Sequence, residues 1–239
     1  MSEIHFEDCC CAGCLGFPQR STSDTDTPEP PGEGNATKPV FSSAQIVNAL
    51  KTAGGSANSM AWSGQTITYS VGTGALSPGQ AYYESEYAGY VAMTAGMESA
   101  AVEAFEMWDD LIAIDLVAVE DSPAANISFN YSSNTGNSTY AERSVSGANP
   151  GNGATFSMTD TDLWFADSWW THNQTSDLYA GGYGLLTYLH EIGHALGISH
   201  PGPYNGSATF GPSATHFQDT RGYTVMSYFN ASANGSGTD

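Results

Sequence analysis

The chain has very few basic residues. Its 239 residues include 5 Lys and Arg against 25 Asp and Glu, which gives a formal net charge of −20. Proteins that bind nucleic acid or anionic membrane surfaces use cations to neutralise phosphates, so we expect neither partner here. Because a large net charge of one sign also keeps protein molecules apart in solution, we expect a monomer.

Long apolar runs and dispersed cysteines are also missing. No run of about 18 apolar residues occurs, so we expect no membrane insertion. The stretch MSEIHFEDCCCAGC at the start is acidic and has no apolar centre, so it does not resemble a Sec signal peptide. All four cysteines lie in this stretch, at Cys9, Cys10, Cys11 and Cys14, and we therefore expect no disulfide in the rest of the chain.

The composition divides the chain into two parts. Residues 1–40 are rich in Pro, Gly, Ser, Thr and acid and have little to bury, which predicts a disordered acidic leader or pro-segment. We expect residues 41–239 to form one folded domain, because 40% of the whole chain is hydrophobic. Ser42 or Ser43 is positioned to cap a first short helix there.

Local patterns predict a mixture of helices and strands within residues 41–239. An apolar stripe that runs from Met97 to Leu111 and Ile112 predicts a helix over residues 96–112. Alternation or short apolar runs predict three strands, at residues 65–72, 114–120 and 125–132. We expect a polar loop over residues 134–153, an edge strand over 154–159, and an aromatic run over 162–170 that is either buried core or the lining of a cleft.

Three of the six histidines fall in the stretch HEIGHALGISH, residues 190–200. We expect a helix over about residues 185–196, on which His190 and His194 project from one face a single turn apart. Gly197 can take the left-handed conformation that ends a helix and turns the chain, and this turn brings His200 toward the first two.

This spacing predicts a zinc site. Three neutral imidazoles at His190, His194 and His200 leave one position open on a tetrahedral zinc ion, which is the arrangement of catalytic sites. Glu191 adjoins the first ligand and is placed to act as general base and then general acid. Any one of these histidines could be an ordinary core residue, but the set at fixed spacing favours a metal site.

The motif HExxHxxGxxH resembles that of the metzincin zinc endopeptidases. Residues 186–230, including VMSYF around Met226, resemble the serralysin branch, the secreted bacterial proteases of RTX type. The resemblance implies a zinc endopeptidase that is secreted and cleaves protein or peptide substrates. It also implies that Met226 packs under the zinc ligands, and that Tyr228 is an additional zinc ligand that swings away to stabilise the transition state.

The resemblance implies an α+β fold as well. The metzincin fold has a twisted, mixed and mostly parallel five-stranded sheet packed with long helices, and its active-site helix forms the floor of a cleft. The edge strand of the sheet would hold an extended peptide by strand addition, and the residues expected there are 154–159.

The chain departs from the serralysin pattern in two ways. Neither the further C-terminal helix nor GGxGxD repeats follow Met226, so we expect no calcium site, and either a fragment of a longer protein or a reduced form of the enzyme. The cysteine cluster suggests a second hypothesis, in which a thiolate from Cys9–Cys14 occupies the open zinc position in a zymogen.

Two alternatives to an active enzyme are a secreted binding or adhesion module that keeps the zinc fold, and a fragment that cannot fold alone. Glu191 favours the enzyme, because a binding module needs no base beside the metal.

Overall fold

Alternating large side chains along residues 66–71 give strand β3 (Thr66–Val71) a buried face that carries Ile67 and Tyr69. This strand lies inside the sheet of a computed structural model that describes residues 4–8, 38–52, 58–72, 84–120, 125–136, 138–146, 154–168 and 177–235. The buried face of β3 packs under a long helix, where the rings of Tyr69 and Phe105 stack with centroids 3.9 Å apart.

Among the described residues, eight strands form one sheet, in the order β1-β7-β8-β6-β3-β5, with β2 beside β8 and β4 beside β6. The other strands are β1 (Ile4–Asp8), β2 (Ser59–Trp62), β4 (Tyr90–Val91), β5 (Asp115–Ala118), β6 (Ile127–Ser132), β7 (Tyr140–Ser146) and β8 (Thr155–Ala166). β5, β3, β6 and β8 run parallel, and β7 is antiparallel to β8. The expected five-stranded, mostly parallel sheet is therefore confirmed, and three short strands extend it.

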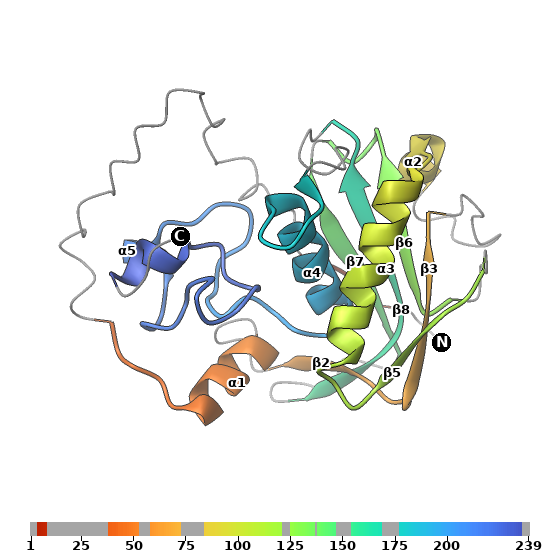
Figure 1. Cartoon of the computed structure of the whole chain (residues 1–239). Helices are drawn as coiled ribbons and strands as arrows, with labels where there is room; N and C mark the ends of the chain where they lie inside the picture. The colour runs from red at the N-terminus through yellow and green to blue at the C-terminus, as the bar shows by residue number, and fades with distance from the viewer. Residues whose placement is uncertain are drawn as a thin grey trace, which may run out of the picture.

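Two helices, α3 (Ala95–Asp109) and α4 (Tyr183–Ala195), lie side by side on one face of this sheet (Figure 1). The indole nitrogen of Trp108 donates to the carbonyl of Leu189 at 3.0 Å and so fixes the two helices to each other. The stripe predicted for residues 96–112 packs as expected up to Trp108, but Leu111 is 79% exposed. That part of the prediction is wrong because the helix ends at Asp109, so the periodicity no longer applies.

The main hydrophobic core lies between the sheet and these two helices. Aromatic rings fill its centre, with Phe129 stacked on Phe165 at 4.3 Å and Tyr188 of α4 edge-on to both. Leu163, Trp164 and Phe165 are all fully buried, so the described part of the aromatic run is core rather than the lining of a cleft. Trp169 and Trp170 lie outside the described residues.

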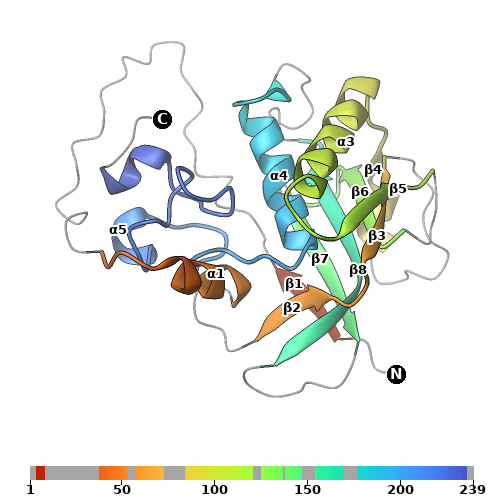
Figure 2. The same cartoon turned by 60° about the horizontal axis from the view of Figure 1, so that its bottom comes forward.

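Helix α1 (Ser43–Lys51) begins as the sequence predicts. Ser42 is its N-cap and forms a capping box with Gln45. The described residues after His200, 201–235, contain only the short helices α5 (Phe210–Ser213) and η5 (Ala231–Asn234). They pack around a small cluster of their own, which includes Tyr204 and Phe229. Helix α2 (Glu84–Ala88) lies near the top of α3 and contacts the sheet, where the ring of Tyr87 is edge-on to that of Trp164 with centroids 5.0 Å apart. In both cartoon views α4 lies between the sheet and the part that follows His200 (Figure 2).

The structure corrects two predictions about the sheet. The segment expected to be a polar loop contains β7, which pairs antiparallel with β8. Residues 154–159, the expected edge strand, begin β8, which lies inside the sheet between β7 and β6. Strand β1, which pairs with β7, falls within residues 1–40, where we expect a disordered leader or pro-segment. β1 is therefore the edge strand on this side of the sheet, and β7 is its neighbour.

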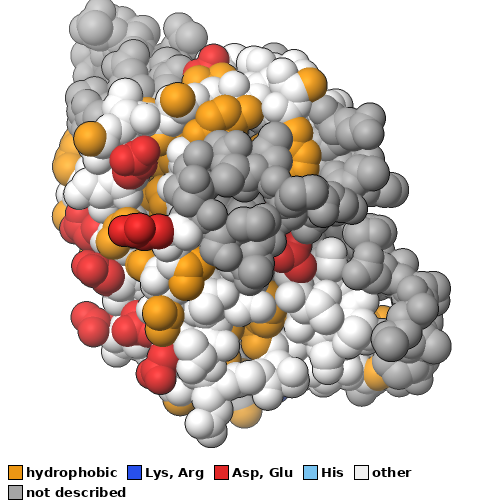
Figure 3. All heavy atoms as spheres, turned by 90° about the vertical axis from the view of Figure 1, so that its right-hand side faces the viewer, with side chains coloured by type: hydrophobic (Ala, Val, Ile, Leu, Met, Phe, Trp, Pro, Cys, Tyr) orange, Lys and Arg blue, Asp and Glu red, His pale blue; other side chains and the backbone are white. Residues whose placement is uncertain are grey.

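Acidic side chains are spread over the face shown in Figure 3, in keeping with the excess of Asp and Glu. In the part of the chain that the structure describes, no helix is long and apolar enough to cross a bilayer. The division into a leader 1–40 and a domain 41–239 stays a prediction. Pro39, within the range 1–40, is hydrogen-bonded to the range 41–239: its carbonyl accepts from the backbone N–H of Phe217 at 2.9 Å.

Candidate metal centre

Helix α4 presents the first two predicted ligands, and a tight turn presents the third. Backbone N–H groups of Gly197 and Ile198 donate to the carbonyls of His194 and Gly193, both at 2.9 Å, which is the hydrogen-bond pattern of a Schellman motif. Gly197 has φ +92, the left-handed conformation expected of it. A side chain there would also meet the carbonyl oxygen of Met60 at 2.6 Å, so glycine is required for two separate reasons.

The turn brings the three histidines together. The Nε2 atoms of His190 and His194 lie 3.1 Å apart, those of His194 and His200 3.1 Å apart, and those of His190 and His200 3.2 Å apart. All three side chains are buried, and they form the one His, Cys, Asp and Glu cluster in the described residues that is able to hold a metal ion. The predicted ligand set is thus assembled around one point.

The other nitrogen of each ring is bonded to a backbone carbonyl. Nδ1 of His190 donates to Val225 at 2.8 Å, and Nδ1 of His194 donates to Ile198 at 2.8 Å. Nδ1 of His200 donates to the carbonyl of Tyr204 at 2.9 Å. A carbonyl oxygen only accepts, so each Nδ1 carries the proton and each Nε2 has a free lone pair.

This geometry fits a zinc ion. Three Nε2 lone pairs directed at one point cannot hydrogen-bond to one another, and a cation between them removes their repulsion. Two nitrogens at about 2.0–2.1 Å from a tetrahedral zinc lie about 3.3 Å apart, and the separations here are 3.1 to 3.2 Å. The carbonyls that orient the rings are the outer partners usual for zinc-binding histidines. Three nitrogen donors also leave a coordination position for water or substrate.

Burial favours neutral, metal-competent imidazoles. It lowers the pKa of His190 to about 4, against a weaker upward effect of the hydrogen bond to Val225. Burial, followed by the neighbouring imidazoles, lowers the pKa of His194 and His200 well below the ordinary value. Because zinc binds the deprotonated nitrogen, ligands that are already neutral have no proton to release when the metal binds.

Glu191 is fully buried beside the cluster. Neither of its carboxylate oxygens has a hydrogen-bond partner among the described residues, so both are open to a donor. Burial raises the pKa of Glu191 well above its ordinary value, and the positive charge of Arg143 partly offsets this rise. Arg143 is itself buried, with its guanidinium 3.5 Å from the carbonyl oxygen of His194.

The segment that contains Met226 lies directly under α4. Met226 is 1% exposed, and its sulfur lies so close to Gly193 that a Cβ there would meet it at 2.5 Å. The preceding residue, Val225, is the hydrogen-bond partner of His190. The prediction that Met226 packs beneath the ligands is therefore in accord with its position.

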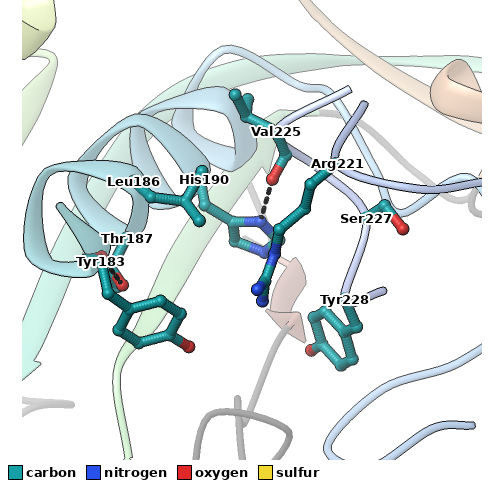
Figure 4. Close-up of a pocket in the computed structure, with 8 residues that line it drawn as sticks. All are labelled: Tyr183, Leu186, Thr187, His190, Arg221, Val225, Ser227 and Tyr228. Carbon is teal, nitrogen blue, oxygen red and sulfur yellow. Dashed lines mark hydrogen bonds between the residues drawn. The ribbon is translucent and has the colours of Figure 1, made fainter. Parts of the chain in front are cut away.

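Tyr228 lies against two of the histidines. Its ring is edge-on to that of His200, with centroids 4.5 Å apart, and its centroid is 5.9 Å from that of His190. Tyr228 and His190 line a pocket together with six residues of α4 and of the segment around Met226 (Figure 4). The six are Tyr183, Leu186, Thr187, Arg221, Val225 and Ser227. One of the three predicted ligands, His190, thus lines a pocket next to α4.

Asp219 connects the loop of the third ligand to the segment around Met226. One oxygen of its buried carboxyl accepts from the hydroxyl of Tyr204 at 2.7 Å and from that of Ser227 at 2.8 Å. Tyr204 in turn provides the carbonyl that orients His200, and its ring stacks on that histidine with centroids 5.3 Å apart. Asp219 thus acts on a ligand through Tyr204 rather than by contacting a histidine.

The remaining predicted candidates lie elsewhere. His216 is buried away from the cluster and stacks on Phe41 with centroids 4.4 Å apart. His172 and the cysteines lie outside the described residues, and so does the side chain of His5. The thiolate hypothesis therefore stays a prediction.

Comparison with known proteins gives one family match. The profile of the matrixin family, peptidase family M10, matches residues 80–208, which is more than half of the chain. The chain is 33% identical to "Serralysin" of Photorhabdus laumondii over 144 residues, 59% of this chain and 28% of that protein. It is 35% identical to "Metallopeptidase AprA" of Pseudomonas marginalis over 149 residues, 60% of this chain and 29% of that protein. The chain thus matches less than a third of the length of these curated relatives. On the match to its profile, the chain belongs to the matrixin family of M10 peptidases.

Proposed function

We propose that this chain carries the catalytic domain of a zinc endopeptidase that hydrolyses peptide bonds in protein substrates. The observation that carries the proposal is the meeting of three Nε2 lone pairs, from His190, His194 and His200, beside the buried and unpartnered carboxylate of Glu191. Membership of the matrixin family and the similarity to serralysin and AprA support the same activity.

In this proposal His190, His194 and His200 hold the zinc ion. When bound, zinc lowers the pKa of a water molecule to about 7 and polarises the carbonyl of the scissile peptide. Glu191 accepts a proton from the attacking water at a carboxylate oxygen and passes it to the nitrogen of the leaving amine. Because this carboxylate is buried and neither oxygen has a hydrogen-bond partner among the described residues, both oxygens are open to accept that proton.

We assign Tyr228 two roles, one before and one during the attack on the peptide carbonyl. It is an additional zinc ligand in the resting enzyme, and its hydroxyl later donates to the oxygen that becomes negative as the peptide carbonyl is attacked. Its place beside His200 and on the pocket wall supports these roles. We propose protein or peptide substrates and a monomeric, secreted enzyme, in line with the serralysin resemblance.

The test compares zinc content and casein hydrolysis in the full chain and in Glu191→Gln. We expect one zinc per chain in both, with kcat/KM lower by about 10²–10⁴-fold in the variant, because general base catalysis is lost. Glu103→Gln, which changes an exposed glutamate on α3, is the matched control and should retain full activity. Zinc binding without hydrolysis that depends on Glu191 would instead favour a binding module, and loss of both zinc and folded structure would favour a fragment.

A further inference from the structure

The pocket beside α4 carries one positive charge on its wall. Of the eight described residues that line it, Arg221 is the one basic residue, and none is acidic. The same wall includes His190, the first of the predicted metal ligands. A peptide bound at the metal therefore places a residue next to its scissile bond within reach of Arg221.

The guanidinium group of Arg221 points into this pocket. Figure 4 shows it between the rings of Tyr183 and Tyr228, beside the imidazole of His190. The central carbon of the guanidinium lies 5.4 Å from the centre of the Tyr183 ring. The charged head thus faces the space that a substrate side chain would fill.

Contacts on two sides hold Arg221 in this position. Its Nη1 donates to the side-chain oxygen of Asn230 at 3.0 Å, and its backbone N–H donates to the carbonyl of Phe229 at 2.8 Å. The cation–π contact with Tyr183 of α4 fixes it from the other side. A charge held in place in this way loses less conformational entropy when an anion binds than a freely rotating side chain does.

A carboxylate is the group that this arrangement favours. The planar guanidinium matches the geometry of a carboxylate, and charge-assisted hydrogen bonds between the two are stronger than neutral ones. Leu186 and Val225 add apolar wall, which lowers the local dielectric and strengthens such a pair. The pocket encloses about 270 Å³. This is less than the roughly 300–1,000 Å³ of pockets for drug-sized ligands, so it suits a single side chain.

We propose that Arg221 selects protein substrates that carry Asp or Glu in one of the two positions flanking the scissile bond. This inference rests on the proposed endopeptidase function and gives it a substrate class. Arg221 acts on specificity by contacting the substrate, and it takes no part in the proton transfers assigned to Glu191.

The charge of the whole chain acts against the same substrates. With a net charge of −20, the molecule repels acidic peptides at long range. A preference for an acidic residue next to the scissile bond therefore requires a local cation. Arg221 is that cation on the described pocket wall.

The first test uses the zinc-loaded native chain, so it requires no variant to fold. Four quenched fluorescent peptides share one Ala–Ser scaffold and carry Glu, Gln, Leu or Lys at a single central position, and mass spectrometry locates the cleaved bond. We expect cleavage on one side of the Glu, with kcat/KM about tenfold or more above that of the Gln peptide, because a charge-assisted bond replaces a neutral one. The Lys peptide should be the poorest, because like charges meet. The proposal would be overturned by equal kcat/KM for the Glu and Gln peptides, by faster cleavage of the Leu peptide, or by a cut away from the central Glu.

The second test assigns the preference to Arg221. In Arg221→Gln we expect the ratio of kcat/KM between the Glu and Gln peptides to fall to about one, because the positive charge is lost. Arg221→Lys should keep part of the preference, since it retains the charge but not the planar fork. Lys51→Gln removes the same charge from an exposed position at the end of α1 and should keep the native ratio. A ratio of rates is unaffected by a loss of active protein, so partial unfolding of a variant does not obscure it. A native ratio in Arg221→Gln would overturn the assignment.

The third test does not depend on hydrolysis. Fluorescein-labelled Glu and Gln peptides are titrated by anisotropy into zinc-loaded Glu191→Gln, and into the same chain with Arg221→Gln. We expect the Kd of the Glu peptide to be about tenfold lower than that of the Gln peptide only where Arg221 is present. Equal Kd values in the chain that keeps Arg221 would overturn the proposal. A difference that depends on Arg221, in a protein whose Glu191 parent hydrolyses no peptide, would instead refute the endopeptidase function and leave the acidic selectivity of the pocket standing.

Discussion

The sulfur of Met226 lies against the backbone of Gly193, so close that a Cβ on Gly193 would approach it to 2.5 Å. Gly193 lies in α4 between the ligands His190 and His194, and Val225, the neighbour of Met226, orients the first ligand. The absence of a side chain at Gly193 thus lets the segment around Met226 reach the helix that carries the metal ligands.

Gly193→Ala should destabilise the enzyme. In an ordinary helix interior this change stabilises by about 0.5–1 kcal/mol. Here the added methyl group also meets the ring of Trp108 at 3.2 Å. Overpacking a rigid core costs about 1–3 kcal/mol, so we expect a lower Tm and weaker zinc binding. Gly211→Ala, where the methyl group meets nothing within 4 Å, is the control and should not lower Tm. A Tm for Gly193→Ala at or above that of the native chain would contradict this account.

Tyr228→Phe tests the role assigned to the hydroxyl. If that group donates to the oxyanion, its removal should lower kcat by about 10²–10³-fold. KM should change little, and zinc should stay bound because the three histidines are intact. Tyr223→Phe is a matched control, since Tyr223 is 54% exposed and does not line the pocket. A native kcat in Tyr228→Phe, measured with zinc-loaded protein, would rule out the catalytic role.

The metal ligands could be predicted from the sequence because local geometry determines them. A spacing of four on a helix puts His190 and His194 on one face, and Gly197 is the residue type that the turn requires. The groups that orient the ligands were not predictable in this way. They are the backbone carbonyls of Val225, Ile198 and Tyr204, and any residue type provides a carbonyl.

The edge of the sheet could not be read from local pattern for a different reason. In β7, Ala141, Arg143 and Val145 alternate with more polar residues, but a buried arginine interrupts the apolar face and makes the segment look like a loop. Arg143 is buried because α4, about fifty residues later in the chain, covers it. The strand pairing of Ile4–Asp8 likewise depends on β7, so composition alone indicated a disordered leader.

Removing zinc should destabilise the folded chain. Without a cation, three Nε2 lone pairs face one another at 3.1 to 3.2 Å, and nothing offsets the cost of burying them. A ligand that binds only the native state stabilises it by mass action, so we expect dialysis against 1,10-phenanthroline to lower Tm by several degrees. One equivalent of zinc should restore Tm, whereas magnesium should not, because it prefers oxygen ligands. An unchanged Tm after verified removal of the metal would show that the cluster does not need it.

Asp162 of β8 lies directly opposite Glu142 of β7 in the strand register. Both side chains are buried, at 4% and 7% exposure, and like charges in such a position destabilise a sheet. Burial raises the pKa of Asp162 to about 6, and a hydrogen bond from Ser128 offsets part of the rise. The folded chain thus holds a proton on this carboxyl at pH values where the unfolded chain has released it.

This difference in bound protons between the folded and the unfolded chain determines how the stability of the fold changes with pH. The protonated carboxyl contributes stability that is fully present below about pH 4 and is lost as the pH rises through about 6. Asp162→Asn keeps an acceptor for Ser128 and removes the charge, so at pH 8 it should stabilise the chain by about 1–3 kcal/mol relative to native. We expect the difference in Tm between variant and native chain to stay nearly constant from pH 8 to about pH 7 and to shrink as the pH falls through 6 to 5, measured by thermal melts of zinc-loaded protein. Asp115→Asn, at an exposed position of β5, should give no such trend. A difference that is constant with pH would mean that Asp162 is ionised with an ordinary pKa, and that its burial is compensated by contacts other than Ser128.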